Sequence, residues 1–287
     1  MTIHFSFSPN TPALIYWQIN SETADKYLQD KEYFLIVKQI QKCCPLVVLI
    51  IDYAGKMNKQ LLIEIIKELK AKHIFVKYET NIKNIFIIES ISDWCDAVVL
   101  SSNDVLEDNY IYKLKELNIE VELKLYITSD NIKRIHSGLY DLVQISSVKD
   151  IMFVRKNYDK QIMEEDMDNL LIGIAELEVE QNGNTFIGYK DYEADIKNLS
   201  KNRKIQFDLV IRSNGDIALS LIMNIIGGNI NTHTLFAIWT RYLKEFWFAE
   251  KVKLTFLGFQ SLSEQKFVRY ANLNQPLHCD SLLGGEK

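Results

Sequence analysis

The chain has 287 residues, of which 47% are hydrophobic, enough for one large domain, or one large and one small, around a buried core. Its net charge is −5 and its lysines and arginines are scattered, so no basic stripe points to a nucleic-acid partner. No stretch approaches ~20 consecutive apolar residues and no basic-then-apolar leader opens the chain, which predicts no membrane span, no secretory signal and a cytoplasmic location.

The first half of the chain alternates between apolar runs and helical patterns. One helix carries an apolar stripe from Leu61 to Leu69, and a later one is predicted to start at Asp104 as its N-cap. This alternation is typical of βα units in a parallel sheet, so we expect an α/β fold with a partial (βα)6 barrel. A different βα barrel and an open α/β sheet are the alternatives. The predicted strands are 3–7, 46–52, 74–78, 97–101, 121–127 and 142–146.

The second half changes to hairpin patterns. A turn at 181–184 is predicted to join Val179 to a strand at 185–189. A clearer hairpin turns at Asn214 and Gly215, which both tolerate positive φ, and apolar residues alternate on either side of that turn. We therefore expect a hairpin region after the barrel.

A short helix is predicted to close this region. Gly228-Asn229-Ile230 reads as a turn, and the helix after it, from about Thr232, places Trp239 on an inward apolar face. The predicted division is a barrel at 1–160, a connecting segment with a hairpin at 161–204, an extension at 205–259 and a C-terminal tail at 260–287.

The potential metal ligands show no ligand spacing. Cys43 and Cys44 are adjacent, Cys95 and Cys279 are isolated, and the histidines form no closely spaced pair. The cysteines are therefore predicted to be ordinary cytosolic thiols, and no metal site is expected.

The order of elements in the barrel region resembles that of the radical S-adenosylmethionine (SAM) enzymes. The resemblance rests on the strand and glycine turn at 46–57, the strand at 74–81 with Thr80-Asn81 at its end, and the segment 96–104. In that family the first strand is followed by CxxxCxxC, whose thiolates hold a [4Fe–4S] cluster. The window 8–18, which follows the predicted first strand, contains no cysteine. The resemblance therefore implies a pseudo-radical-SAM protein without the cluster.

The extension resembles the C-terminal SPASM or twitch domain of peptide-modifying radical-SAM enzymes. The matching residues are Asn214, Gly215, Gly228, Asn229, Ile230 and Trp239. Leu219 and Ser220 stand where the family has a cluster cysteine, so no second cluster is expected.

The turn after the second strand bears on SAM itself. In the family a Gly-Gly-Glu-Pro turn holds the amino group of SAM, and Ala54-Gly55-Lys56-Met57 takes its place here. A lysine at this turn would repel an ammonium in a partly desolvated site. The resemblance thus implies no cofactor, neither cluster nor SAM.

Polar residues end several predicted strands, where a βα barrel has its mouth. Asp52 and Glu79 are the candidates for an acid–base pair there. The candidate mouth residues are Asp52, Tyr53, Lys56, Glu79, Ser101 and Tyr126, with Ser102 and Ser146 at further strand ends.

The family resemblance implies a non-catalytic accessory protein in ribosomal peptide natural-product biosynthesis, as in Bacteroidales systems with Gly-Gly leader motifs. Its expected partners are the precursor peptide, the active radical-SAM maturase or both, with no nucleic acid and no membrane. A free hairpin edge at 205–221 is predicted to accept the peptide as an added strand. The alternatives are a cluster-independent barrel enzyme acting on a small molecule and a metabolite-binding regulatory domain.

Overall fold

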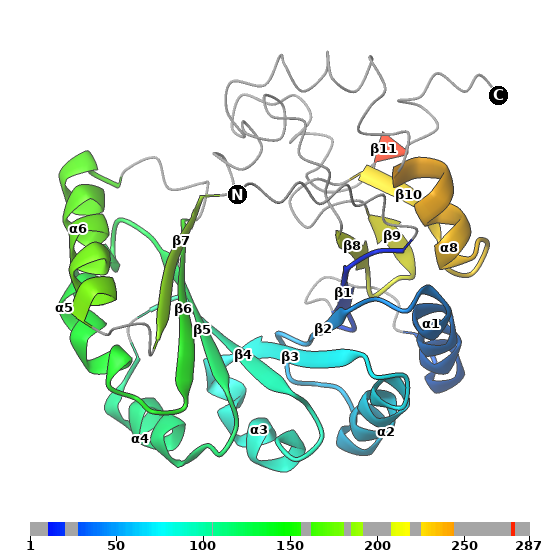
Figure 1. The fold of residues 1–287 in the computed structure, drawn as a ribbon, viewed down its shortest axis with the longest axis horizontal. Helices are drawn as coiled ribbons and strands as arrows, with labels where there is room; N and C mark the ends of the chain where they lie inside the picture. The colour runs from blue at the N-terminus through cyan, green and yellow to red at the C-terminus, as the bar shows by residue number, and fades with distance from the viewer. Residues whose placement is uncertain are drawn as a thin grey trace, which may run out of the picture.

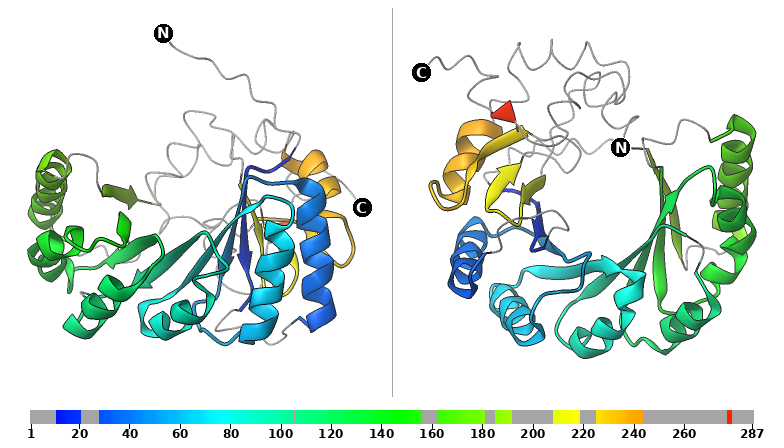
Figure 2. Two further views of the ribbon diagram at one scale, coloured as in Figure 1. Left: turned by 60° about the horizontal axis from the view of Figure 1, so that its bottom comes forward. Right: turned by 180° about the vertical axis from the view of Figure 1, so that it is seen from behind.

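A computed structural model describes residues 11–20, 28–104, 106–155, 162–180, 185–191, 208–218, 225–243 and 277–278. The strands of these residues form one curved sheet in the order β11-β10-β9-β8-β1-β2-β3-β4-β5-β6-β7. Helices line its convex side, as Figures 1 and 2 show from three directions. This is a mixed α/β fold with a mostly parallel sheet and alternating βα units, as the sequence predicts. Among the described residues, no helix is both long and apolar enough to cross a membrane.

The strands from β1 to β7 all run parallel to their neighbours. They are β1 Leu14–Gln18, β2 Val47–Ile51, β3 Phe75–Asn81, β4 Ala97–Ser102, β5 Val121–Ile127, β6 Val148–Arg155 and β7 Phe186–Asp191. The helices between them are α1 Asp30–Cys43, α2 Lys59–Lys70, the 3-10 turn η1 Ile82–Asn84, α3 Ile85–Ile91, α4 Asp108–Glu116, α5 Ile132–Val143 and α6 Glu164–Glu180.

Alternation along β5 shows how the sheet separates its two faces. Leu123 and Leu125 belong to the main apolar core with the helices, whereas Lys124 and Tyr126 lie between them in sequence and are only partly buried. Because successive side chains of a strand point to opposite faces, Lys124 and Tyr126 face the concave side. The helices therefore cover an apolar face, and part of the concave face is polar.

Two predicted boundaries of the barrel are wrong. Leu142 and Val143 do not start a strand, because they complete the buried stripe that α5 makes with Leu139, and the sixth strand is β6. Asp104 does not cap α4, which begins after Glu107. The backbone N–H of Asp104 instead donates to the hydroxyl of Ser102 at 3.2 Å.

The first strand of the sheet is β1, which lies inside the window 8–18 that was expected to be the cluster loop. Its Cα partners are in β2 on one side and β8 on the other, and Ile15 and Trp17 alternate into the core. The predicted strand at 3–7 lies outside the described residues. The stretch of sequence between β1 and α1, residues 19–29, also contains no cysteine.

The hairpin predicted around 181–184 is also wrong. Val179 belongs to α6, and β7 pairs with β6 in parallel register, so α6 and β7 add another βα unit to the sheet instead of forming a connecting hairpin. Apolar residues at helical spacing, such as Leu170, Ile174 and Leu177, bury one face of α6. The division at 160, 204 and 259 remains a prediction.

The hairpin at Asn214 and Gly215 is confirmed. Strands β8 Asp208–Ile211 and β9 Asp216–Ala218 pair antiparallel, and Gly215 has a φ of +86°. Gly228 and Asn229 end strand β10 Ile225–Asn229, so the predicted turn begins only after them. The other elements are α8 Leu235–Ile238, the π-helical turn Trp239–Leu243 and β11 Leu277–His278.

The hairpin does not offer the free edge that was predicted. Strand β8 pairs with β1 on one side and β9 on the other, and β9 pairs with both β8 and β10. The reason is that β1 ends the row of parallel strands and leaves an unpaired edge, which the hairpin covers. Peptide addition to this hairpin would have to displace existing pairing.

Contacts with α1 hold the segment between β10 and α8 in place. The Gln39 side chain donates to the carbonyl of Ile230 at 3.3 Å and accepts from the backbone N–H of Leu235 at 2.7 Å. Trp239 is 2% exposed and lies in the main core with Leu235 and Ile238, as its predicted inward position requires.

Candidate functional site

The candidate mouth residues come from four neighbouring strands. Asp52, Tyr53 and Lys56 follow β2, and Glu79, Ser101 and Tyr126 lie near the carboxyl ends of β3, β4 and β5. Ser146, by contrast, precedes β6 and so lies toward the opposite rim. The structure thus brings all but one of these polar residues to one end of the sheet.

Glu79 is the centre of a polar cluster on the concave face. Its side chain is 1% exposed, and its Oε1 accepts from the Tyr53 hydroxyl at 2.8 Å and the Lys124 Nζ at 3.0 Å. The Lys124 ammonium also lies 5.7 Å from the centre of the Tyr126 ring. The cluster therefore joins three predicted residues through Lys124, which the sequence did not single out.

A second ion pair lies beside the first. Lys77 of β3 pairs with Glu122 of β5, so β3 carries Lys-x-Glu where β5 carries Glu-x-Lys. Both pairs cross β4, whose register places Val99 between Glu79 and Glu122. This reversed order of charges at alternate positions of the two strands could have indicated from the sequence that Lys124 pairs with Glu79. The two pairs give this part of the concave face a balanced charge.

Burial strongly disfavours ionisation of the Tyr53 hydroxyl. Desolvation, followed by the negative charge of Glu79, raises the pKa of the Tyr53 hydroxyl far above its usual range. The phenol therefore stays protonated at physiological pH and donates to Glu79. Lys124 donates to the same carboxylate oxygen, so the cluster holds the Tyr53 proton and the Lys124 charge in fixed positions. The negative charge of Glu79 is balanced by that lysine.

Asp52 does not share this cluster. Its carboxylate accepts from the Tyr78 hydroxyl at 3.2 Å, and Tyr78 and Glu79 are consecutive residues of β3 that point to opposite faces. Beside Asp52, the pKa of Tyr78 is raised, first by desolvation and then by the charge of Asp52. The structure therefore separates the predicted acid–base pair into two polar groups with different donors.

The remaining mouth residues have local roles. Lys56 is exposed to solvent, so water screens the repulsion that was expected to act on an ammonium at this turn. The buried hydroxyl of Ser101 donates to the carbonyl of Thr80 at 3.2 Å, and that of Ser102 donates to the carbonyl of Asp104 at 2.8 Å.

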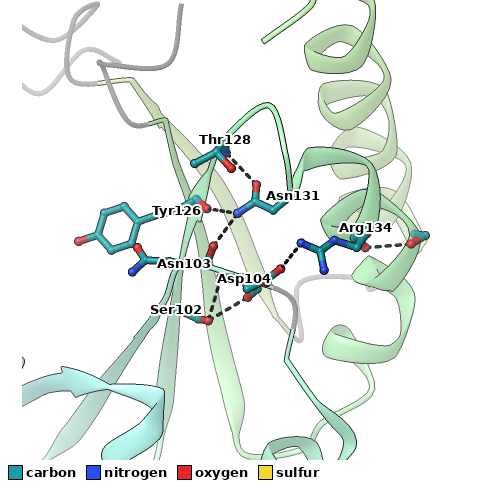
Figure 3. A network of polar contacts seen from close by, with 8 residues as sticks. Ser102, Asn103, Asp104, Tyr126, Thr128, Asn131 and Arg134 are labelled. Carbon is teal, nitrogen blue, oxygen red and sulfur yellow. Dashed lines mark hydrogen bonds and ion pairs between the residues drawn. The ribbon is translucent and has the colours of Figure 1, made fainter. Parts of the chain in front are cut away.

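Asn131 ties the loops after β4 and β5 together (Figure 3). Its side chain donates to the carbonyls of Asn103 and Tyr126, both at 2.8 Å, and accepts from the backbone N–H of Thr128 at 2.7 Å. Asn131 is buried, and the ring of Tyr126 points away from it toward the concave side. Sequence reasoning missed this asparagine, which fixes the backbone that carries Tyr126.

Four residues of the predicted SPASM-like motif, Asn214, Gly215, Asn229 and Ile230, belong to one hydrogen-bonded cluster. The Asn229 side chain donates to the Asp216 carboxylate at 2.9 Å, and the backbone N–H of Ile230 donates to the carbonyl of Gly215 at 2.8 Å. The Asn214 carbonyl oxygen of the side chain accepts from the backbone N–H of Asp216 at 3.0 Å. These bonds tie the hairpin turn to the end of β10. Leu219 and Ser220 lie outside the described residues.

The described cysteines do not fit the cluster that the sequence resemblance implies. Cys43 and Cys44 end α1 just before β2, and Cys95 precedes β4, so all three lie toward the amino ends of the strands, away from the mouth. Burial raises the pKa of Cys43 to about 11 and that of Cys95 to about 12, which disfavours the thiolate. Within the described residues, no group of three potential ligands could hold a metal ion.

The similarity of this chain to known proteins lies in its fold and not in its sequence. No protein-family model and no curated protein matches the chain. The crystal structure of SuiB from Streptococcus suis, bound to S-adenosylmethionine, matches with a TM-score of 0.60 and 13% sequence identity, over 87% of this chain and 66% of SuiB. The fold of this chain is therefore similar to that of SuiB. The chain spans less than two thirds of SuiB, and at this identity only the fold is shown.

Weaker matches come from other α/β proteins. They include a HpcH/HpaI aldolase/citrate lyase family protein from Burkholderia cenocepacia, with a TM-score of 0.41 and 5% identity over 71% of this chain and 89% of that one. Another is 3-dehydroquinate dehydratase from Aquifex aeolicus, with a TM-score of 0.36 and 13% identity over 62% of this chain and 88% of that one. Similarity at this level carries no argument about function.

Proposed function

We propose that this chain is a non-catalytic, radical-SAM-like accessory protein that binds a precursor peptide or the active radical-SAM maturase in ribosomal peptide biosynthesis. The observation that carries the proposal is the radical-SAM-like fold together with a stretch of sequence between β1 and α1, residues 19–29, that has no cysteine. Three thiolates anchor the cluster on which the family's chemistry depends. A chain that keeps the fold and lacks these ligands is suited to binding.

The polar cluster at the mouth also supports binding over turnover. A catalytic acid or base needs a pKa matched to its task and access to the substrate. Glu79 forms an ion pair with Lys124 and accepts a hydrogen bond from the Tyr53 hydroxyl. Asp52 accepts hydrogen bonds from two backbone N–H groups at 3.1 and 3.3 Å. These carboxylates are engaged within the protein, which weakens the alternative of a barrel enzyme.

We place partner binding on side chains of the extension, because the hairpin edges are paired. Phe236 of α8 is 48% exposed, and Asn214 and Asn231 are exposed near the hairpin turn. An exposed aromatic ring is a suitable anchor, since aromatic residues carry much of the energy of protein interfaces. The Gln39 contacts hold α8 in a fixed position for this role.

The test measures binding of the intact protein to the precursor peptide and to the maturase encoded closest to it. Phe236→Ala is expected to weaken binding by about tenfold or more, as for an interface anchor. Tyr112→Ala on α4, which removes another exposed ring (64% exposed), is the matched control and should bind like the parent. Absence of binding to both partners would refute the proposal, as would small-molecule turnover that Glu79→Gln abolishes.

A second measurement addresses the cluster directly. After anaerobic reconstitution with iron and sulfide the protein is expected to remain colourless, because the sequence between β1 and α1, residues 19–29, contains no cysteine to hold a cluster. Stoichiometric iron and sulfide with a thiolate-to-iron absorption band would show that other cysteines hold a cluster, and the accessory role would then be wrong.

A further inference from the structure

The Asp52 carboxylate joins three segments of the mouth. Its Oδ1 accepts from the side chain of Asn20 at 3.1 Å and from the backbone N–H of Lys56 at 3.3 Å. Its Oδ2 accepts from the backbone N–H of Met57 at 3.1 Å and from the Tyr78 hydroxyl at 3.2 Å. Asp52 is buried, and these four donors come from the loop after β1, the turn after β2 and strand β3.

Two carbonyl groups of the same turn, those of Asp52 and Tyr53, are engaged as well. The carbonyl of Asp52 accepts from the Thr80 hydroxyl at 2.7 Å and from the N–H of Gly55 at 3.1 Å. The carbonyl of Tyr53 accepts from the Asn84 side chain at 3.1 Å. Gly55 has a φ of +62°, and a Cβ built on it would lie 2.7 Å from Asn84, so the turn packs closely against the end of η1.

An ammonium group needs free acceptors, and Asp52 has few to give. A carbonyl oxygen has two lone pairs and a carboxylate about four acceptor positions. The protein's own donors fill both positions on the Asp52 carbonyl and four on its carboxylate. A ligand ammonium could bind here only by displacing buried hydrogen bonds, each of which is costly to break.

We infer that Asn20 and Asp52 form a direct clasp between the loop after β1 and the turn after β2, and that this turn does not receive the amino group of S-adenosylmethionine. These are the two segments to which the family resemblance assigns the cluster and the SAM amino group. In this chain the side-chain hydrogen bond from Asn20 to Asp52 joins them. The inference concerns the barrel mouth and does not depend on peptide binding by the extension.

The experiment combines equilibrium dialysis of the full chain against labelled SAM with hydrogen exchange read by mass spectrometry. We expect no saturable binding at about 1 mM SAM, a concentration that would reveal even a millimolar dissociation constant. We expect slow exchange at the amides of Lys56 and Met57, and exchange about tenfold or more faster in Asp52→Ala, which removes their acceptor.

Asn20→Ala is the milder variant and decides the matter if Asp52→Ala does not fold. It should speed exchange in the loop after β1 because it removes only the clasp. Asn58→Ala, which removes the exposed side-chain cap on the N–H of Leu61, is the control and should leave that loop and the turn after β2 unchanged. Saturable SAM binding that protects residues 52–57, or unchanged exchange in the loop in Asn20→Ala, would overturn the inference. Neither result would bear on peptide binding.

Discussion

Removal of Lys124 tests whether the Glu79 cluster is a buried ion pair. At the observed N–O separation of 3.0 Å, the attraction is about 5 kcal/mol at an effective dielectric near 20, and desolvation offsets much of it in the intact pair. In Lys124→Met the Glu79 carboxylate, 1% exposed, loses its cation and keeps the Tyr53 hydroxyl. We expect a loss of about 3–5 kcal/mol in the free energy of unfolding, the usual cost of breaking a buried pair.

The assay is urea unfolding followed by far-UV circular dichroism and tryptophan fluorescence. The double variant Glu79→Gln/Lys124→Met carries no uncompensated charge, so it should be more stable than Lys124→Met alone. Lys133→Met is the control, because its pair with Asp166 is 3.6 Å long and the lysine side chain is 75% exposed, which predicts a loss below about 1 kcal/mol. If Lys124→Met behaves like Lys133→Met, the concave face is open to water and the reasoning fails.

Three further predictions concern the extension and the thiols. Trp239→Ala should destabilise the protein by roughly 3–5 kcal/mol, because the ring is almost fully buried, and an unchanged thermal midpoint would show that it is not. Gly228→Ala should cost about 1–3 kcal/mol, since its Cβ would lie 2.8 Å from Ile238, and urea unfolding would detect this overpacking. Cys43, whose pKa burial raises to about 11, remains a thiol at pH 8, so iodoacetamide should label the exposed Cys44 first. Peptide mapping that finds equal labelling of the two would contradict that burial.

Local periodicity was enough to locate most of the parallel sheet. The predicted strand at 121–127 coincides with β5, and the apolar stripe from Leu61 to Leu69 lies within α2. Where the prediction failed, a local pattern had two readings. The apolar pair Leu142 and Val143 fits either a strand or the buried face of a helix. In the structure these residues continue α5, because they extend the helical spacing of Ile132, Ile135 and Leu139.

The sequence predicted where the residues of the candidate site lie, but not which residues form hydrogen bonds with one another. Strand ends correctly brought Asp52, Tyr53, Glu79 and Tyr126 to one rim, yet the proposed pairing of Asp52 with Glu79 was wrong, since their side chains have different donors. The face of the sheet to which a side chain points depends on the residue at which the strand ends. A strand that is apolar on both faces has no alternating pattern, so its sequence does not show where it ends.

By itself, the sequence determines the alternating βα organisation, the buried faces of the helices and the absence of cysteine between 19 and 29. Only the tertiary structure decides that β8 covers the edge of β1, that Lys124 neutralises Glu79, and that Gln39 holds the first turn of α8. The residues of the last two contacts are 45 and 196 positions apart in sequence. Helix and strand periods act over a few residues, whereas these contacts depend on how the whole sheet curves and closes, so no local pattern contains them.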